Sequence, residues 1–283
     1  MILLQRLACA ALTLWAPFAF SAETVDRSGG PFVPTPPAVV EAMLKLAGVG
    51  PKDFVVDLGS GDGRIVLAAA RLHKASGVGV EIDQELVDQA NGAARKQGLA
   101  ERARFVRQDV READLSRATV LTLYLLPGMM HNLRTKLLSE LRPGARVVSH
   151  DFTFDQWKPD RSIKVETQEK YEITGLWVSD VHLWIVPASV QGAWRVRFPD
   201  APADEVRLDL KQSFQHFSGS FVRNGRMLRV RDGRITGGRL VFSVPGETGR
   251  TDRYSASVSG ERMTGEVRDG ETVIARWNAT RAP

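Results

Sequence analysis

The apolar positions in the first two thirds of the chain follow two patterns that take turns. Short apolar runs typical of buried strands alternate with segments whose apolar residues recur at helical spacing. This order predicts βαβ units, and therefore a parallel sheet with helices on both faces. Two further strands, 162–171 and 176–188, follow with no helix between them and are expected to finish the sheet as an antiparallel pair. The other predicted strands are 54–58, 77–83, 103–109, 118–126 and 145–152, and the predicted helices are 36–47, 63–73, 84–98 and 128–141.

The pattern changes after Pro187, where helical spacing stops. Short runs with alternating apolar and polar residues follow, such as 226–231, 239–244, 254–259 and 272–277. These runs predict an antiparallel meander, folded as a small barrel or a sandwich. Turn-forming pairs separate the runs: Asn224-Gly225, Asp232-Gly233, Gly237-Gly238, Pro245-Gly246 and Asp269-Gly270.

Two domains are therefore expected, joined near Ser189. The predicted order is a signal peptide over 1–22, a linker over 23–35, an α/β domain over 36–188 and an antiparallel β domain over 190–283. The chain of 283 residues is long enough for both domains to have a core of their own.

The N-terminus has the order of a secretory signal peptide. Arg6 precedes an uncharged apolar run, Leu7–Phe20, and small residues follow at Ser21 and Ala22, where we expect cleavage. The run is short for a membrane-spanning helix. We therefore predict export to the periplasm with no stable membrane span after cleavage. The alternative is an uncleaved segment that anchors the protein in the inner membrane.

The net charge of +5 is unevenly distributed. Residues 1–189 contain 22 Lys and Arg against 22 Asp and Glu, whereas residues 190–283 contain 16 against 11. The excess could favour an acidic partner, but an Arg-rich solvated sheet face is the preferred interpretation, and no nucleic acid is predicted. Cys9 is the only cysteine, and the five histidines form no metal-ligand spacing, so we predict no metal.

A glycine-rich turn, "DLGSGDGR", follows the first strand of the α/β domain. Glycines in such a turn let backbone amides approach a ligand, next to the N-terminus of a helix. The spacing differs from the dinucleotide fingerprint, and Asp57 would repel a pyrophosphate. A carboxylate there would instead pair with an ammonium or sulfonium group, which favours S-adenosylmethionine (SAM) over NAD. The candidate cofactor-binding residues of this segment are Asp57, Gly59, Ser60, Gly61 and Gly63.

Two more acids end the next strands of the predicted sheet. Glu81 ends the second strand, where a carboxylate can accept hydrogen bonds from ribose hydroxyls. Asp109 ends the third strand, within reach of an adenine amino group. Acids at the ends of three successive strands are a stronger signal than the glycine turn alone. Asp62 is expected to cap the following helix.

The segments "FVPTPPAVVEAML", "DLGSGDGRIVLAAA" and "GVGVEID" together resemble class I SAM-dependent methyltransferases. The resemblance is greatest to the small protein-lysine N-methyltransferases of the mitochondrial ATP-synthase c-subunit and adenine-nucleotide-translocase type, and it spans Pro31 to Phe154. It implies a Rossmann-like sheet for the α/β domain, SAM as the cofactor, and N-methylation of a protein lysine, whereas the second, smaller all-β domain is expected from the sequence pattern alone. It does not cover the β meander.

The resemblance also implies roles for single residues. Thr35 would close over the cofactor, with a plain helix cap as the alternative. Tyr124, at the end of the fourth strand, would orient the substrate amine, with an aromatic residue of the core as the alternative. His150 and Asp151 end the fifth strand, where Asp151 would attract the lysine ammonium and His150 would accept its proton. The preferred alternative for both is that they are ordinary polar residues at a strand end.

Two other functions stay open on the sequence. SAM is made in the cytoplasm, so an exported chain would be separated from its cofactor. The protein would then be a non-catalytic module that binds another nucleotide or a partner on a methyltransferase scaffold. Methylation of a small molecule or a lipid is the other alternative.

Overall fold

The computed structural model describes residues 29–246 and 250–282, and for residues 202–205 it describes the backbone only. The predicted signal peptide lies outside the described residues. Within the described part, no helix is both long and apolar enough to cross a membrane.

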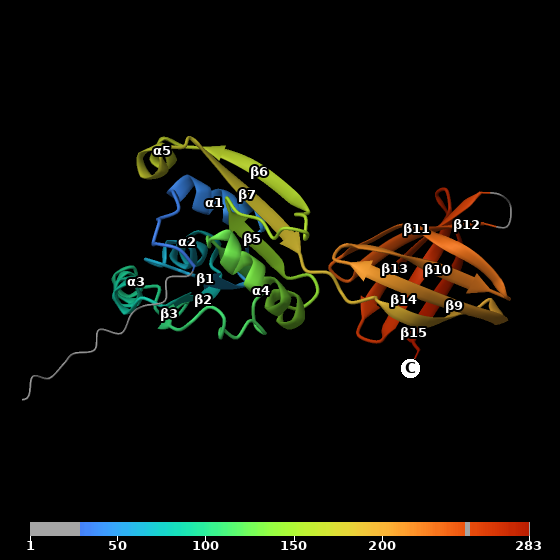
Figure 1. Cartoon of the computed structure of the whole chain (residues 1–283). Helices are drawn as coiled ribbons and strands as arrows, with labels where there is room; N and C mark the ends of the chain where they lie inside the picture. Colours follow the sequence, from blue (N-terminus) through green and yellow to red (C-terminus); the bar gives the residue numbers. More distant parts are fainter. Residues whose placement is uncertain (1–28, 247–249, 283) are drawn as a thin grey trace, which may run out of the picture.

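The first domain is a seven-stranded, mostly parallel sheet between helices (Figure 1). Its strand order is β3-β2-β1-β4-β5-β7-β6, in which β7 runs antiparallel to both neighbours. The predicted Rossmann-like fold with a reversed last strand is therefore confirmed. The strands are β1 Phe54–Leu58, β2 Ser76–Glu81, β3 Ala103–Arg107, β4 Val120–Leu123, β5 Arg146–His150, β6 Arg161–Glu166 and β7 Val178–Ile185. The helices are α1 Pro37–Leu46, α2 Arg64–His73, α3 Gln84–Lys96, α4 Pro127–Glu140 and α5 Gln168–Thr174.

The central strands are buried because helices cover both faces of the sheet. All four residues of β4 are buried, and so are four of the five residues of β1. One face packs against α1 and α2 through Val39, Met43 and Ile65. The other packs against α4 through Met130 and Leu133. The strand ends next to the glycine turn are thereby held in fixed positions.

One element differs from the prediction. The segment 162–171 was expected to be a single strand, but it turns into α5 after Glu166. The Thr167 side chain accepts a hydrogen bond from the Lys170 backbone N–H, and Gly175 ends the helix in the left-handed conformation. A helix N-cap and a glycine C-cap thus outweigh the strand character of this segment.

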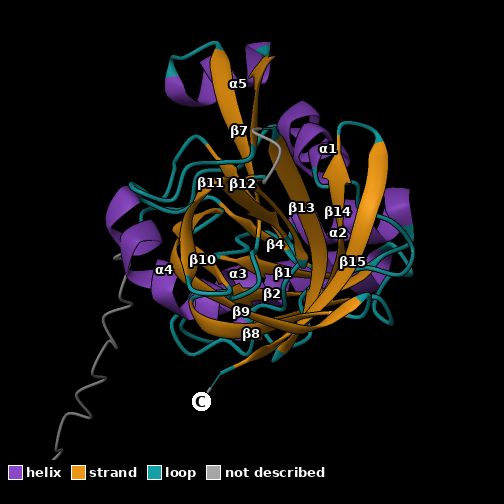
Figure 2. Cartoon of the chain, turned by 90° about the vertical axis from the view of Figure 1, so that its right-hand side faces the viewer, coloured by secondary structure: helices purple, strands orange, loops and turns teal. Residues whose placement is uncertain are grey.

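The second domain is a closed barrel of eight antiparallel strands, which Figure 2 shows as a ring. This confirms the all-β prediction and selects the barrel over the sandwich. Its interior is filled by aromatic side chains, including Trp194, Phe242, Tyr254 and Trp277. The strands are β8 Gly192–Phe198, β9 Ala201–Ser213, β10 His216–Arg223, β11 Arg226–Thr236, β12 Arg239–Pro245, β13 Thr251–Ser259, β14 Arg262–Asp269 and β15 Thr272–Arg281.

One turn prediction in the barrel is wrong. Asp232-Gly233 does not end a strand but forms a bulge within β11, where the pairing register shifts between Arg231 and Arg234. Asp232 has a φ of 53°. A Cβ on Gly233 would lie 2.2 Å from the Phe217 carbonyl oxygen. The pair therefore lets neighbouring strands approach closely and bends the barrel wall, and it does not reverse the chain.

The two domains meet at the end of the sheet where β5 begins and β7 ends. Ala188 N–H donates to the Gly237 carbonyl at 2.8 Å, and the Trp157 and Phe214 rings stack with centroids 6.1 Å apart. The Asp160 carboxylate accepts hydrogen bonds from Gln215 at 3.2 Å and from Arg234 at 3.1 Å. The barrel is therefore attached opposite the carboxyl ends of the parallel strands (Figure 1).

Candidate active site

The glycine turn connects β1 to α2 in a tight loop. The N–H groups of Gly59 and Ser60 donate to the Val80 carbonyl at 2.9 and 3.1 Å, which fixes the turn to β2. Gly63 has a φ of 81°, and a Cβ there would lie 2.5 Å from the Phe105 ring. Gly61 has a φ of 52°, and a Cβ there would lie 2.3 Å from the Phe32 ring. These two glycines shape the turn and its packing, and neither lines the cavity next to it.

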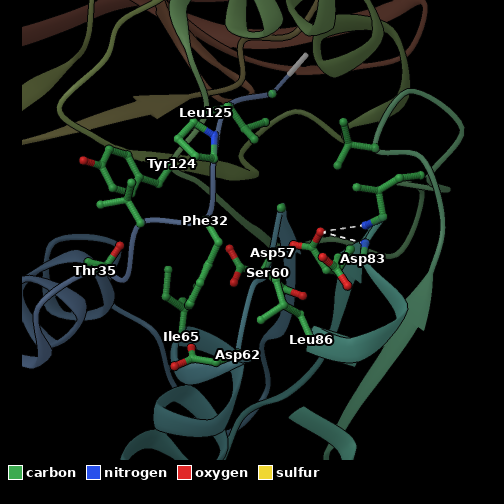
Figure 3. A pocket seen from close by; sticks show the side chains of 18 of the residues that line it. Phe32, Thr35, Asp57, Ser60, Asp62, Ile65, Asp83, Leu86, Tyr124 and Leu125 are labelled. Atoms are coloured by element: carbon green, nitrogen blue, oxygen red, sulfur yellow. Dashed lines mark hydrogen bonds between the residues drawn. The ribbon is translucent and has the colours of Figure 1, made fainter. Parts of the chain in front are cut away.

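That cavity opens at the carboxyl ends of β1 to β4 and has about 980 Å³ of free space including its mouth. Figure 3 shows Asp57 and Ser60 near its centre, Thr35 and Tyr124 on one side, and Asp83 and Leu86 on the other. Six of the eight predicted cofactor residues line it, together with Tyr124. Those six are Thr35, Asp57, Gly59, Ser60, Glu81 and Asp109.

Asp57 is the buried acid at the centre of the cavity, with only 2% of its surface exposed. Its Oδ1 accepts a hydrogen bond from the Thr122 hydroxyl at 2.7 Å, whereas Oδ2 has no partner. Burial raises the pKa of Asp57 to about 7, and the nearby Glu81 and Asp62 carboxylates add to the shift. An unmatched buried carboxylate oxygen beside a cavity fits a cationic ligand group.

Glu81 has a second task that the sequence did not indicate. Its carboxylate accepts backbone N–H groups from Gly61 at 2.8 Å, Ile82 at 2.8 Å and Asp83 at 3.1 Å. These bonds occupy most of its acceptor positions, so Glu81 holds the glycine turn against the end of β2. Asp83 lines the cavity next to it.

Asp109 lines the far part of the cavity and is paired with Arg111. The Arg111 guanidinium donates to both Asp109 oxygens, and its backbone N–H donates to Oδ1 at 2.8 Å. These interactions lower the pKa of Asp109. The carboxylate is thus oriented before any ligand binds.

Thr35 does not cap the helix that follows it, since Pro36 occupies the cap position with no side-chain bond. The Thr35 hydroxyl instead lies 3.2 Å from Nδ1 of His150. Thr35 therefore belongs to a group of polar side chains beside the cavity. We call this group, which consists of Thr35, Tyr124, His150, Asp151 and Lys170, the Tyr124 cluster.

His150 is buried inside this cluster and does not line the cavity. Its Nε2 lies 2.8 Å from the Ser179 hydroxyl and 3.4 Å from Nζ of Lys170. Burial lowers the pKa of His150 to about 4, which keeps the ring neutral at physiological pH. The structure thus engages both ring nitrogens inside the protein, where the sequence suggested a proton acceptor facing the substrate.

Asp151 is already matched by a cation of the same chain. Lys170 Nζ donates to its Oδ2, and the Tyr124 hydroxyl donates to the same oxygen at 3.2 Å. The Tyr124 ring lies 4.0 Å from the His150 ring, centroid to centroid. Burial and the Asp151 charge raise the pKa of Tyr124 to about 12. Lys170 was missed by the sequence analysis because its segment was expected to be a strand.

The apolar lining was also missed by the sequence analysis, because no motif distinguishes these residues from core residues. It is supplied by loops and by the first turns of α2, α3 and α4. Its members are Phe32, Val33, Ile65, Ile82, Leu86, Val110, Leu125 and Met129. Apolar walls around a few polar groups are typical of a site for an organic cofactor.

The comparisons with known proteins agree with this geometry. The family model of the ANTKMT methyltransferase domain matches residues 57–161. A protein-lysine N-methyltransferase of Saccharolobus islandicus is 43% identical over 153 residues, which cover 54% of this chain and 95% of that protein. The adenine nucleotide translocase lysine N-methyltransferase of Mus musculus is 34% identical over 152 residues, which cover 54% of this chain and 63% of that protein.

Among solved structures, an RNA methyltransferase from Salinibacter ruber in complex with S-adenosyl-L-homocysteine is 47% identical, with a TM-score of 0.50. The match covers 56% of this chain and 96% of that chain. The S. ruber protein thus binds S-adenosyl-L-homocysteine, the product form of SAM, on a similar fold. The chain belongs to the SAM-dependent methyltransferase family that includes the protein-lysine N-methyltransferase of S. islandicus.

Proposed function

We propose that this protein transfers the methyl group of SAM to the ε-amine of a lysine in a protein. The observation that carries the proposal is the Tyr124 cluster beside the cofactor cavity. It offers an aromatic ring, a neutral imidazole and a carboxylate whose charge is already balanced. The names of the S. islandicus and M. musculus relatives support the same acceptor.

We further propose how the cavity holds the cofactor. The unpartnered Asp57 oxygen would accept the ammonium of the methionine part, with the glycine turn beneath it. Glu81 and Asp83 would face the ribose, and Asp109 would face the adenine. Thr35 and Tyr124 line the side of the cavity that adjoins the Tyr124 cluster, so the acceptor would enter there.

The chemistry needs a neutral amine, because an ammonium has no lone pair. SAM supplies a methyl group on a sulfonium, and the amine nitrogen forms the new N–C bond as the C–S bond breaks. The methylated ammonium then loses a proton to solvent. This chain contributes alignment and a partly apolar pocket that Tyr124 lines, and the Tyr124 ring stacks on Phe152 with centroids 6.1 Å apart.

An RNA acceptor is the second candidate, because the S. ruber protein is described as an RNA methyltransferase. Binding of RNA depends largely on cations that contact phosphates. Residues 1–189 contain as many acids as bases, 22 of each, and this part of the chain contains the whole cavity. The charge balance therefore favours a protein acceptor.

The test is to incubate the purified full chain with radiolabelled SAM and a cell lysate, with and without ribonuclease or protease. We expect label in protein, and mass spectrometry should find it on lysine Nζ. Label that ribonuclease removes would establish the RNA acceptor instead. Label in the lipid or small-molecule fraction would contradict the lysine proposal.

We also propose that the protein is exported, from the order of Arg6, the apolar run and the small residues that follow it. A reporter fused after Pro283, active only outside the cytoplasm, tests this location. Activity of the reporter together with loss of the first 22 residues is expected. A cytoplasmic reporter on an intact N-terminus would contradict export and would give the enzyme direct access to SAM.

A further inference from the structure

Lys170 is a buried amine that the transfer reaction does not use directly. Only 2% of its surface is exposed, although it belongs to a seven-residue helix whose neighbouring residues Tyr171 and Glu172 are exposed. Burying a charged lysine is costly unless the charge is paired and hydrogen-bonded. Lys170 meets this condition because its Nζ donates to the Asp151 carboxylate.

Its contacts complete a chain of interactions that links two residues of the cavity wall, Thr35 and Tyr124. Thr35 contacts His150 at 3.2 Å, and His150 contacts Lys170 at 3.4 Å. Lys170 donates to Asp151, which accepts from Tyr124 at 3.2 Å. Nζ of Lys170 also lies 5.6 Å from the centroid of the Tyr124 ring. Thr35 and Tyr124 both line the cavity, so Lys170 connects them from behind.

Asp151 is held in place from the other side by β7. Its backbone has a φ of 63°, its N–H donates to the Asp180 carbonyl at 2.7 Å, and its Oδ1 accepts the Asp180 N–H at 3.1 Å. Other titratable groups lie around it: His150 Nε2 is 3.5 Å from its Oδ1, and His182 interacts with its backbone. The Asp180 carboxylate pairs with Lys164 of β6 at 2.9 Å, and His182 contacts the Ser162 hydroxyl at 2.8 Å. Burial lowers the pKa of His182.

We propose that Lys170 is a positioning residue that neutralises Asp151, so that the acceptor lysine meets an uncharged wall and binds as the neutral amine. This inference rests on the proposed lysine acceptor. Without Lys170, the bare Asp151 carboxylate would stabilise the substrate ammonium and raise its pKa. With Lys170 in place, Asp151 keeps the Tyr124 hydroxyl oriented without holding the acceptor in its unreactive form.

The test is the pH dependence of kcat for lysine methylation by the full chain, because kcat reports groups in the enzyme–substrate complex. Lys170→Met should move the rising limb to higher pH. Each unit of this shift lowers the rate at a fixed pH on that limb by about tenfold. Asp151→Asn should move the limb the opposite way, and the double variant should lie near the wild type. Lys170→Arg keeps the charge and should keep the wild-type limb.

A matched control is Lys164→Met, which removes an exposed lysine from its pair with Asp180. Its pH profile should be that of the wild type. Calorimetric binding of S-adenosylhomocysteine to each variant checks that the fold is intact. Equal profiles for Lys170→Met and Lys170→Arg in folded protein would overturn the inference, and so would methylation of Lys170 itself. Failure of the lysine proposal is seen separately, as a wild-type protein that labels no lysine at all.

Discussion

The two domains differ in what they bury. Ten polar or charged residues are buried among those that the structure describes, and nine of them lie in the Rossmann-like domain. The tenth, Gln215, faces the other domain and donates to the Lys158 carbonyl at 2.8 Å. The barrel interior is instead packed with aromatic and aliphatic side chains. The nine are Thr35, Asp57, Ser60, Glu81, Thr122, Ser149, His150, Lys170 and Ser179.

This difference separates function from stability. Buried polar groups cost free energy, and they gather where a ligand or a reaction requires them. All residues that line the cofactor cavity lie between residues 29 and 129. The barrel is attached at the other end of the sheet, where β5 begins and β7 ends. Substitutions in the barrel should therefore change stability, whereas substitutions in the cavity should change binding and catalysis.

The largest effect is expected from Trp277→Ala, inside the barrel. The indole is fully packed among Phe242 and Tyr254, and its loss should lower the free energy of unfolding by about 3–5 kcal/mol. Affinity for S-adenosylhomocysteine should not change. Denaturant unfolding and calorimetry measure the two quantities. Trp177→Ala is the control, since that indole is 54% exposed. Loss of cofactor binding in a folded Trp277 variant would contradict the assignment of stability to the barrel and of binding to the Rossmann-like domain.

Asp57→Ala should weaken SAM binding tenfold to a hundredfold with little change in the barrel. The carboxylate oxygen without a partner is the group that we expect to pair with the ammonium. Loss of a charge-assisted hydrogen bond is worth roughly 1.5–3 kcal/mol. Isothermal titration calorimetry measures the effect, with Asp155→Ala as the control because that exposed acid pairs with His131 and does not line the cavity. Equal affinity in both variants would remove Asp57 from the site.

SAM affinity should rise with pH through the titration of Asp57. The pKa of this group is raised from 3.8 to about 7 by burial. Without ligand, the folded state keeps its proton while the unfolded state loses it, so this group reduces stability as pH rises from 3.8 towards 7. A cationic ligand prefers the ionised form, so affinity should increase about tenfold between pH 5.5 and 7. A flat profile would contradict this assignment, and Asp57→Asn should give one.

The smallest effect is expected at the contact between the domains. Arg234→Ala removes one of three hydrogen bonds to the Asp160 carboxylate and leaves those from Gln215 and the Ile185 N–H. Since Arg234 is half exposed, the loss should be below about 1 kcal/mol. Thermal unfolding, compared with Arg229→Ala, measures it. A much larger loss would show that the two domains stabilise each other and do not contribute separately to stability and to function.

The fold was largely predictable because its signals are local. Alternating strands and helices, glycine turns and period-two runs each depend on a few neighbouring residues, and they identified the sheet and the all-β domain. Helix α5 and the bulge at Asp232-Gly233 were missed because capping by Thr167 and contact with Phe217 decided them. Both are interactions of single residues that a pattern of hydrophobicity does not show.

The cavity was predictable where acids end strands, since parallel strands bring their carboxyl ends together. Asp57, Glu81 and Asp109 accordingly line one cavity. The partners of these acids were not predictable. Lys170 lies in α5 and pairs with Asp151, which is 19 positions earlier in the chain, and the bond between Thr35 and His150 joins residues 115 positions apart.

The most direct test is a crystal structure of the full chain with S-adenosylhomocysteine. We predict one molecule per chain in the cavity at the ends of β1 to β4, with its amino group at the Asp57 oxygen that has no partner in the protein. Its sulfur should lie on the side of Thr35 and Tyr124. A ligand bound elsewhere, or an amino group that faces away from Asp57, would contradict the site described above.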